Sequence, residues 1–548
     1  MFVRTQSNGS RTYLLIVENR RVDGTIQQDI LHRLGRLDKL LESGRLDALL
    51  ASLGRFSEKY AVLGAHLKGD SLRVQTTKIG PPLLFGRIWS QIGIDRLLAD
   101  LLRDRKFEFA VERAIFLTVL HRLVAPGSDR AAEKWKQDYS LPGAAELELH
   151  HLYRAMAWLG EPLPKEPQSE AGARGPRTTK DLIEEELFGR RRDLFSSLEV
   201  VFFDTTSIYF EGEGGETLGH YGNSKDHRPD RKQMVVGLVL DNEGYPVCCE
   251  MWPGNATDVK SLLPVVERLK KRFRVGQVCV VADAGMISAE SITAVEQRGW
   301  SYILGARLRQ SKEVREKVLS QRGRYEEVHP PRSQSKDPSP LKVKPVEVEG
   351  RRYIVCLNRE QAEKDRRDRE AIVAALEEAL PRGAKSLVGN KGYRLYLKAR
   401  GESFSIDKEK VRREARYDGK WVLRTNTDLS AREVALKYKQ LWMVEEMFRS
   451  MKSVLETRPI YHRRDETIRG HVFCSFLALV LRRELERRLE TGGRRLEWAD
   501  VIRDVDALQE VELEVDSKRY LLRSETKGAA GKVFQACGVA LPPVLRPC

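Results

Sequence analysis

The sequence lacks the features that mark disulfide-rich, zinc-binding and membrane-spanning proteins. Its seven cysteines form no CxxC pair and no disulfide-like framework, and its ten histidines form no HxxxH pair. The longest apolar run near a helix, CSFLALVL, is far shorter than the ~20 residues that a bilayer requires. No apolar leader follows Met1, and no GxxxxGK[ST] phosphate loop is present. We therefore expect a soluble cytoplasmic protein in a reducing compartment, without use of a nucleoside triphosphate.

What the sequence does have is an excess of positive charge. Lys and Arg number 95 against 79 Asp and Glu, which gives a net charge of +16 and a pI near 9.4. This balance favours a polyanionic partner, with nucleic acid first and an anionic membrane second. The basic residues are scattered and do not gather beside an apolar helix, which disfavours membrane binding. A surface of mixed charge without such a partner is the alternative.

The length of 548 residues favours three to four domains. Residues 1–190 predict a mainly helical N-terminal region, with one hairpin candidate at TYLLIVENRRVDGTIQQ (Thr12–Gln28) and continuous helical patterns from Pro81 to Leu159. Pro, Gly and charged residues at 161–180 predict a linker. A small basic helical unit before a linker is a candidate DNA-binding module, although it shows no clear helix-turn-helix signature.

The middle of the chain predicts an α/β fold. LEVVFFDTT (Leu198–Thr206) and VGQVCVVADAG (Val275–Gly285) each indicate a buried strand with an Asp at its end. With the strands and helices between and after them, the predicted order is β-β-β-α-β-α-β. We assign residues 191–309 to the first part of this core, 310–430 to a β-rich insertion, 431–495 to the second part of the core and 496–548 to a C-terminal region.

The stretch YKQLWMVEEMFRSMKS (Tyr438–Ser453) predicts one helix with an unusual polar row. Tyr438, Glu445 and Lys452 recur every seven residues, which aligns them within about 40° on a helix. The row borders an apolar stripe that should face a core. A solvated helix face or a chance spacing is the alternative interpretation. The stripe consists of Leu441, Val444, Met447, Phe448, Met451 and Leu455.

Asp204, Asp283 and Glu445 are candidate metal ligands. The two aspartates end strands, and ligands collect at such edges of α/β sheets. Three carboxylates held together repel one another unless a hard cation such as Mg²⁺ neutralises them. Two such ions ~3.5–4 Å apart can activate water and stabilise the leaving oxygen of a phosphodiester. The pattern thus favours phosphoryl transfer on a nucleic acid, with Tyr438 and Lys452 at its phosphates, although a single Asp at a strand end is more often a turn or cap residue.

Further cations in SKDHRPDRKQ lie just before the second strand. Lys225, Arg228 and Arg231 are candidate phosphate contacts, with a solvated loop as the alternative. Other residues of this loop and the next helix are left outside the metal set because mixed loop charges or helix capping explain them. These residues are Asp226, Asp230, Asp258, His220 and His227.

Together these motifs resemble the DDE transposases of bacterial insertion sequences, in the group with a Tyr-x2-Arg-x3-Glu-x6-Lys signature. Tyr438, Glu445 and Lys452 match it, while Leu441 stands where the signature has Arg, and nearby Arg449 could supply that charge. FFDTTSIYFE, PGNATD and VVADAGM resemble the regions around the first two acidic residues. The resemblance covers roughly residues 200–489.

The resemblance implies an RNase H-like core interrupted by a β-rich insertion. Asp204, Asp283 and Glu445 would bind two Mg²⁺ ions, with Mn²⁺ as a substitute, and Tyr438, Lys452 and Arg449 would hold double-stranded DNA. Cleavage at the terminal inverted repeats would free a 3′-OH that attacks target DNA. A homodimer synapsing two ends, nucleoid-associated when acting, is also implied. A Mg²⁺-dependent nuclease that joins no strands and an inactive transposon-derived DNA-binding protein remain alternatives.

Overall fold

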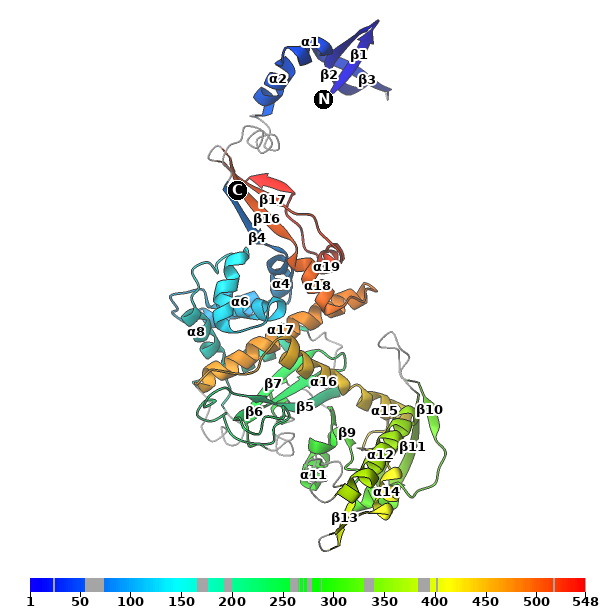
Figure 1. Ribbon diagram of the computed structural model, residues 1–548. Helices are drawn as coiled ribbons and strands as arrows, with labels where there is room; N and C mark the ends of the chain where they lie inside the picture. Colours follow the sequence, from blue (N-terminus) through cyan, green and yellow to red (C-terminus); the bar gives the residue numbers. More distant parts are fainter. Residues whose placement is uncertain are drawn as a thin grey trace. The chain divides into compact units, whose positions relative to one another are not determined.

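The computed structural model divides into two compact units (Figure 1). One comprises Met1–Leu84, Asp138–Ser140 and Arg495–Cys548, and the other comprises Phe85–Gln137 and Leu141–Arg494. Each unit is described by itself. The residues that the structure describes are 1–22, 25–54, 73–164, 176–191, 200–256, 265, 267–269, 271–273, 278–286, 288–329, 340–382, 395–400, 403–515 and 518–547.

The first unit begins with a three-stranded antiparallel sheet in the order β1-β2-β3. Strands β2 (Arg11–Val22) and β3 (Thr25–Arg36) pair as the hairpin that the sequence predicts, so that prediction is confirmed. Strand β1 (Phe2–Asn8) joins β2 through a turn in which Gly9 has a φ of 60°, a conformation that favours glycine. Helices α1 (Leu37–Glu42) and α2 (Arg45–Gly54) follow.

A second sheet of this unit joins strands from opposite ends of the sequence. Its order is β18-β17-β16-β4, and β4 pairs with β16 from Lys78 opposite Gln509 onward. The sequence predicts a separate region for residues 496–548, whereas strands of this segment share a sheet with residues 73–78. The elements are β4 (Arg73–Lys78), α18 (Trp498–Asp506), β16 (Gln509–Val515), β17 (Lys518–Arg523), α19 (Ala530–Cys537) and β18 (Leu545–Pro547).

Helices dominate residues 80–191, as the patterns predict. Helix α17 (Asp465–Thr491) packs against α6 and α8 of this group. A Cβ added at Gly470 of α17 would lie 1.9 Å from the carbonyl oxygen of Met156 in α8, so glycine permits the close approach of the two helices. The group comprises α4 (Gly80–Gln91), α5 (Ile94–Leu102), α6 (Val111–Val124), α7 (Asp129–Trp135), η1 (Lys136–Asp138), α8 (Leu149–Leu159) and α9 (Thr179–Arg191).

The central sheet is mixed and has nine strands in the order β10-β11-β12-β15-β9-β8-β5-β6-β7. Strands β5, β8 and β9 run parallel, and the other pairs are antiparallel. The predicted α/β class is therefore confirmed, although much of the helix predicted from Asp258 lies outside the described residues. The predicted core elements appear as β5 (Val200–Tyr209), β6 (Gln233–Leu240), β7 (Pro246–Pro253), β8 (Cys279–Ala282), η3 (Ala284–Met286), α11 (Ala289–Gln297) and β9 (Ser301–Gly305).

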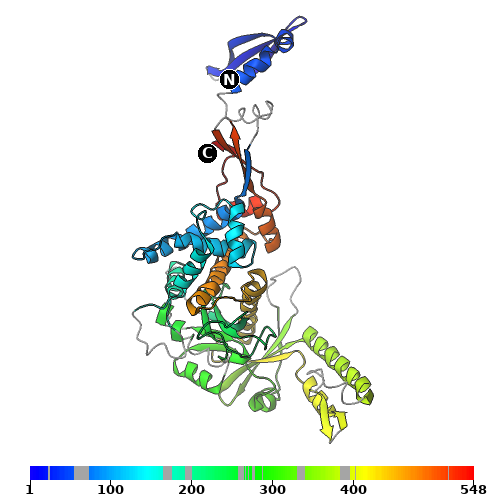
Figure 2. The same cartoon turned by 60° about the vertical axis from the view of Figure 1, so that its left-hand side comes forward.

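Residues 310–430 extend this central sheet. Strand β15 pairs with β9 at Leu423 opposite Gly305, which attaches β12, β11 and β10 to the same sheet. Helix α12 lies beside β12 and the small hairpin β13-β14 (Figure 2). The elements are η4 (Val314–Val318), β10 (Glu326–Val328), β11 (Leu341–Val348), β12 (Arg351–Asn358), α12 (Arg359–Ala379), η5 (Leu380–Arg382), β13 (Leu397–Arg400), β14 (Ser403–Ile406), α14 (Lys408–Ala415) and β15 (Lys420–Thr425).

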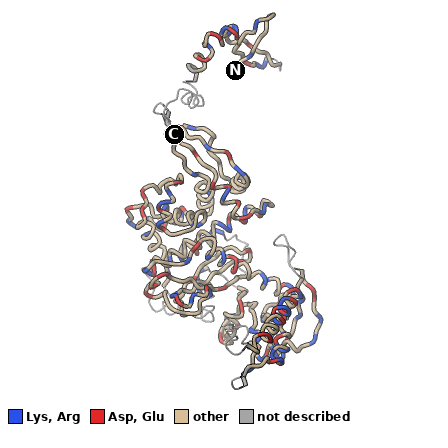
Figure 3. The backbone as a smooth tube through the Cα atoms, in the orientation of Figure 1, with Lys and Arg blue, Asp and Glu red and all other residues tan. Residues whose placement is uncertain are grey.

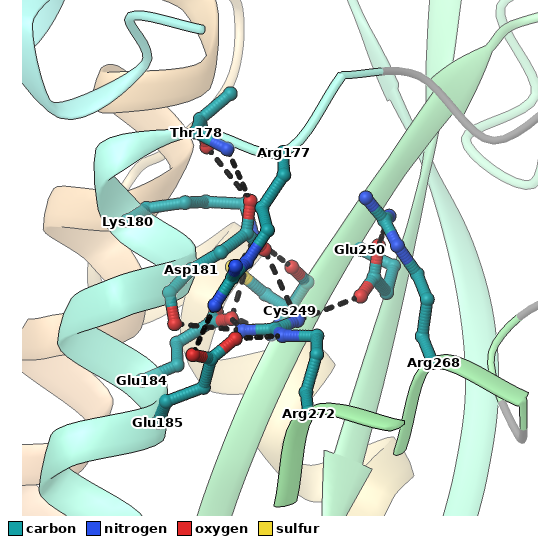
Figure 4. A network of polar contacts seen from close by, with 10 residues as sticks. All are labelled: Arg177, Thr178, Lys180, Asp181, Glu184, Glu185, Cys249, Glu250, Arg268 and Arg272. Atoms are coloured by element: carbon teal, nitrogen blue, oxygen red, sulfur yellow. Dashed lines mark hydrogen bonds and ion pairs between the residues drawn. The ribbon is translucent and has the colours of Figure 1, made fainter. Parts of the chain in front are cut away.

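Helix α9 is joined to strand β7 by buried charges (Figure 4). Lys180 donates to the carbonyl oxygen of Cys249 at 2.8 Å and pairs with Asp181 at 2.9 Å. Arg272 pairs with Asp181 at 3.0 Å and with Glu184 at 2.7 Å. All of these charged side chains are at most 5% exposed, so each charge depends on its partners for stabilisation.

The C-terminal end of the predicted linker at 161–180 is instead buried in this network. Thr178 and Lys180 are buried, and Thr178 donates from its backbone N–H to Asp181 Oδ2 at 2.7 Å. Pro162 and Thr178 also form an isolated bridge. The charged residues at the end of this segment belong to a buried network, which composition does not reveal. Residues 165–175 lie outside the described part. Across the described residues, no helix is both long and apolar enough to cross a membrane.

The crossing of α8 and α17 gives a stability prediction. Gly470→Ala should lower the free energy of unfolding by about 1–3 kcal/mol, because the new methyl group overpacks the contact with Met156. Gly189→Ala in α9 is the matched control, since its added Cβ meets no atom within 4 Å. That change should leave stability unaltered or raise it by up to about 1 kcal/mol. Urea denaturation measures both, and equal effects would contradict the prediction.

Candidate active site at the central sheet edge

The parallel pairing of β5 and β8 brings two aspartates side by side. Phe202 pairs with Val281, so continuing the register by two residues sets Asp204 opposite Asp283. Neighbouring strands lie ~4.8 Å apart, and Asp283 directly follows the end of β8, where ligands bind in α/β sheets. Asp204 is half-buried and Asp283 is exposed. Asp204 is the fifth residue of the ten-residue β5, so the prediction that it ends its strand is wrong, whereas Asp283 does follow the end of β8. The parallel register nevertheless makes the two residues neighbours.

Tyr438 contacts this pair from the last turn of α15 (Ala431–Lys439). Its hydroxyl donates a hydrogen bond to Asp283 Oδ1 at 2.9 Å. Burial raises the pKa of the Tyr438 phenol above its ordinary value, and the negative charges of Asp283 and Asp204 raise it further. The phenol therefore stays protonated at neutral pH and remains a donor. The effect of Asp204 shows that both carboxylates act on the same hydroxyl.

Gly305, the last residue of β9, leaves room for this contact. A Cβ at Gly305 would lie 2.6 Å from the Tyr438 hydroxyl oxygen and 3.3 Å from Asp283 Oδ1. A side chain at this position would therefore displace the tyrosine from the carboxylate.

The single helix predicted over Tyr438–Ser453 is wrong, because the chain turns between two helices. Leu441 and Met443 donate their backbone N–H groups to the residues three positions earlier, Tyr438 and Gln440, which makes a tight turn. Helix α16 (Trp442–Arg449) follows and continues into the π-helical turn η7 (Ser450–Val454). Tyr438 and Glu445 therefore belong to different helices. The apolar stripe is buried across the break at Leu441, Val444, Phe448, Met451 and Leu455.

Glu445 is exposed on α16, which packs against β5 and β6. Its neighbour Val444 and the later Phe448 are buried, so Glu445 stands at the border of the buried stripe. Leu441, which replaces the arginine of the signature, is 6% exposed and precedes the first residue of α16. Leu441 is thus a packing residue of the core and offers no contact to a phosphate.

The three carboxylates are more widely spaced than the ligands of a single compact ion site. Within the described part of the chain, one group of three His, Cys, Asp or Glu residues has its ligand atoms mutually within 4.8 Å, namely Asp129, His462 and His471. Asp204, Asp283 and Glu445 do not form a second such group there. The sheet and α15 bring Asp204, Asp283 and Tyr438 together, while Glu445 is positioned through the packing of α16 on β5.

Lys452 is paired with a carboxylate that the sequence analysis set aside. Its Nζ lies 2.7 Å from Asp226 Oδ1, and Arg458 Nη1 lies 3.2 Å from the same oxygen. Burial lowers the pKa of the Lys452 ammonium, and Asp226 partly offsets that effect. Lys225 precedes Asp226 and donates from its Nζ to the Thr205 carbonyl oxygen at 2.7 Å, next to Asp204. Both predicted lysines therefore lie beside β5 or just after the end of α16.

The three predicted arginine contacts are exposed or half-exposed and ion-paired. Arg228 pairs with Asp230 at 2.9 Å, and Arg231 pairs with Glu211 at 2.9 Å. Arg449 pairs with Glu446 on the same helix, and its side chain is 70% exposed. Such surface pairs contribute little to stability and can exchange partners.

A family model described as a transposase DDE domain matches residues 196–481, more than half of the chain. A second model, an IS1634 family transposase N-terminal domain, matches residues 2–65. The chain belongs to the DDE transposases. This family comprises DNA transposases that cleave and transfer DNA strands with divalent metal ions, and the N-terminal match indicates an insertion-sequence element.

No curated protein matches the transposase. Among solved structures, it is similar to a piggyBac transposase in a synaptic complex with hairpin DNA. That match has 12% sequence identity and a TM-score of 0.36, and it covers 78% of each chain. A similarity of this size carries no structural argument.

Sequence reasoning missed two charged residues of the transposase next to the site. Asp226 lies in a loop of mixed charges, where a buried carboxylate has no distinct signal. Arg458 follows the helical pattern and belongs to no periodic row. A search for a carboxylate able to neutralise a buried Lys452 would have been the only route to Asp226.

The compact Asp129–His462–His471 group joins helices α7 and α17 with the segment between η7 and α17. His462 Nε2 lies 3.2 Å from Asp129 Oδ2 and 3.1 Å from His471 Nδ1. Arg122 Nη2 lies 2.9 Å from this same Nδ1 atom. A guanidinium at a ligand atom opposes a bound cation, so the group fits a buried hydrogen-bonded joint better than a metal site.

The buried Asp129–His462–His471 group predicts that the stability of the protein depends on pH. Burial lowers the pKa of His471 well below its ordinary value, and Arg122 and His462 lower it further against the opposing charge of Asp129. Below a pH of ~6.5 the unfolded chain takes up a proton at this residue while the folded chain does not, so stability falls as pH falls. His471→Gln should reduce this fall between pH ~6.5 and ~5, measured by urea unfolding.

The exposed His329 provides the control for this measurement. Its side chain is 71% exposed, so His329→Gln should leave the pH dependence unchanged. Burial also lowers the pKa of His121 to about 4, so this residue destabilises the folded protein at low pH in the same way. Part of the pH dependence of stability should therefore remain in the His471 variant. A wild-type slope in His471→Gln would show that His471 is protonated in the folded protein.

The hydrogen bond from Tyr438 to Asp283 gives a catalytic prediction. Tyr438→Phe removes the donor and keeps the ring, so the fold should persist while DNA cleavage falls by about 10- to 100-fold, because Asp283 loses the hydrogen bond that orients its carboxylate. Raising the divalent metal concentration should recover part of the rate. Cleavage at the wild-type rate would show that the hydrogen bond has no part in positioning Asp283.

Proposed function

We propose that Asp204, Asp283 and Glu445 are the catalytic carboxylates of this transposase and that they hold Mg²⁺, with Mn²⁺ as a substitute. The observation that carries the proposal is the parallel register of β5 and β8, which sets two carboxylates side by side under one hydroxyl. The packing of α16 on β5 supports the inclusion of Glu445.

The donor set suits a hard divalent cation. Carboxylate oxygens are the ligands that Mg²⁺ prefers, and the exposed Asp283 and Glu445 leave room for water and phosphate oxygens in its shell. A site for two ions also needs carboxylates spread over a wider span than a single compact group provides. When bound, the ions would activate the attacking oxygen and stabilise the leaving oxygen of the phosphodiester.

The side chains around the carboxylates prepare this chemistry. The Tyr438 hydroxyl donates to Oδ1 of Asp283 and so fixes the orientation of that carboxylate. The backbone N–H of Thr205 donates to Asp204 Oδ1 at 2.7 Å and fixes the second. Both contacts reduce the rotamer freedom of the carboxylates before DNA arrives, which is the form of preorganisation that lowers a reaction barrier.

The substrate of this site is the double-stranded DNA at the ends of the element. Cleavage there leaves a 3′-OH, and the same site then directs this hydroxyl at a phosphodiester of target DNA. Strands β5 to β9 would form an RNase H-like core, with residues 310–430 as its insertion. Residues 1–190 would bind the DNA ends, and two copies would hold two ends together in a synaptic homodimer.

The distribution of charged residues alone does not identify where DNA binds. Figure 3 shows positive and negative residues interspersed along the backbone, densely around α12. The DNA contacts are therefore assigned by their closeness to the carboxylates. They are Tyr438, Lys452, Arg449, Lys225, Arg228 and Arg231.

Three substitutions test the proposal. Asp204→Asn, Asp283→Asn and Glu445→Gln should each reduce cleavage of DNA carrying the element ends to background, because each removes one negative charge from the ligand set. Binding of the same DNA in a mobility-shift assay should persist. A pre-cleaved end with a free 3′-OH should be joined to target DNA by the wild type and by none of the three variants.

Glu446→Gln is the matched control for Glu445→Gln. Glu446 is the next residue on α16 and pairs with Arg449, so its loss removes the same charge from the same helix. It should retain cleavage within a few-fold of wild type. Full activity in Glu445→Gln would remove that residue from the ligand set, and cleavage without joining in the wild type would indicate a nuclease.

A further inference from the structure

A cavity of about 770 Å³ lies beside the turn between β6 and β7, and arginines are most of the charged residues that line it. Its walls come from α4 and α5, the end of α9, this turn and the second half of α17. The volume falls within the ~300–1,000 Å³ of typical ligand sites. Within the described part of the chain, no lysine lines the cavity. The arginines are Arg87, Arg96, Arg190, Arg191, Arg487 and Arg488.

Carboxylates of the cavity wall are shared between or paired with some of these arginines. Glu484 accepts from Arg487 at 2.9 Å and from Arg488 at 2.7 Å. Asp241 lies 3.3 Å from Arg191 Nη1. These pairs hold the guanidinium groups in place at the wall, and Arg487 and Arg488 have one carboxylate between them.

Arg87 and Arg96 have no such partner. Both are exposed, and neither side chain forms an ion pair or a hydrogen bond with any described residue. Two further carboxylates lie nearby: Glu243 lines the cavity and is exposed, and Glu186 pairs with Arg190 at 3.0 Å. With these two included, six arginines meet four carboxylates, which leaves a net charge of +2. The cavity is therefore suited to an anionic ligand.

A tyrosine hydroxyl adds a neutral donor among these charges. Tyr245 is 4% exposed and lines the cavity, and the guanidinium carbon of Arg191 lies 3.2 Å from the centre of its ring. Burial raises the pKa of the Tyr245 phenol, and the charges of Arg191, Glu484 and Arg487 also act on it. The hydroxyl is thus protonated and lies among the charged groups of the cavity wall. Its hydrogen is bonded to no described residue, so it is available to a ligand.

The wall of this cavity also touches the helix that carries Glu445. Gly244 in the β6–β7 turn has a φ of 73°, and a Cβ there would lie 2.8 Å from Met443 Sδ in α16. Phe202 pairs with Leu240, so the turn lies toward the start of β5, whereas the second proposed aspartate follows the end of β8. The cavity is therefore separate from the carboxylate site but joined to it by α16.

We propose that this cavity binds phosphate groups of a DNA strand outside the reacting phosphodiester, with Arg87 and Arg96 as direct contacts and Tyr245 as a neutral donor. The inference rests on the proposed function, because it adds a second place at which the same protein holds its DNA. A guanidinium offers two parallel N–H donors to a phosphate, so arginine suits this ligand better than lysine does. A second copy of this chain, with its own net charge of +16, is a poorer occupant.

The first experiment measures how binding of a duplex with the element ends depends on salt in the full chain. Each phosphate contact contributes about −0.9 to the slope of log affinity against log salt concentration. Arg87→Gln and Arg96→Gln break no ion pair, so each should fold and make the slope shallower by about that amount. Arg96→Lys keeps the charge and should keep the slope. Arg130→Gln should also match the wild type, because Arg130 is equally exposed and without an ion pair in the described structure but lies on α7.

The second experiment tests the neutral donor and separates binding from chemistry. Tyr245→Phe should weaken binding by about 2- to 10-fold without changing the salt slope, because it removes a hydrogen bond and no charge. Tyr153→Phe on α8 is its control, since that hydroxyl also bonds to no described residue. In cleavage assays, Arg87→Gln and Arg96→Gln should raise the DNA concentration that gives half the maximal rate. The rate at saturating DNA should stay within a few-fold of wild type.

The third experiment identifies the occupant by arginine modification of the wild-type chain. Phenylglyoxal reacts with accessible guanidinium groups, and mass spectrometry of the digested protein measures each one. Saturating duplex DNA should protect Arg87 and Arg96 and leave Arg130 reactive. Equal protection by inorganic phosphate at the same phosphate concentration would show a small-anion site and overturn the inference. Protection that grows with protein concentration in the absence of DNA would show a contact between copies and overturn it as well.

The inference and the proposed function fail in different experiments. Thermal unfolding of each variant identifies any loss that comes from misfolding. A wild-type salt slope in Arg87→Gln or in Arg96→Gln would overturn the inference while leaving the carboxylates in their roles. Normal cleavage by Glu445→Gln would overturn the proposed function, and Asp204→Asn should still show protection of Arg87 and Arg96 by DNA.

Discussion

The parallel pairing of β5 with β8 is the constraint on which the site depends. In a parallel pair, residues that share a register position lie side by side, so Asp204 within β5 and Asp283 after β8 become neighbours through the backbone alone. An antiparallel pair would keep such neighbours only where the register happened to oppose them. The rest of the architecture follows from this arrangement. Strand β9 ends in Gly305, which lets Tyr438 reach Asp283, and α16, the helix that carries Glu445, packs against β5.

Two clusters of charged side chains in the second unit, one around Lys180 and one around Asp226, differ in the partners that they contact. Around α9 and β7, Lys180 and Arg272 meet enough carboxylates that each buried charge is matched, and the cluster works as a structural joint. Around Asp226, Lys452 and Arg458 share one carboxylate oxygen, and the neighbouring Lys225 donates to the strand that carries Asp204. The first arrangement joins a helix to the sheet, whereas the second joins the end of α16 to the loop before β6.

The sequence predicted the structural features that local residue patterns determine. Short apolar runs ending in Asp revealed β5 and β8, and the spacing of apolar residues revealed the buried stripe from Leu441 to Leu455. The same spacing did not reveal the turn before α16, because the apolar stripe begins at that turn and its residues are buried apart from the half-buried Met447. The contact of Lys452 with Asp226 could not be predicted either, since it joins residues 226 positions apart and neither lies in a distinctive pattern. Composition also misplaced Lys180, whose charge is neutralised by partners that only the fold brings near.

The pairing of β4 with β16 joins two strands that the ribosome synthesises far apart in time. At ~5–20 residues per second, the roughly 430 residues between Lys78 and Gln509 take about 20–90 s to synthesise. Throughout that time β4 has left the ribosome without its neighbour, and its unpaired edge is open to other strands. Chains that stop early cannot build this sheet at all. A chain that stops before Gln509 therefore leaves β4 without the strand that it pairs with in the folded unit.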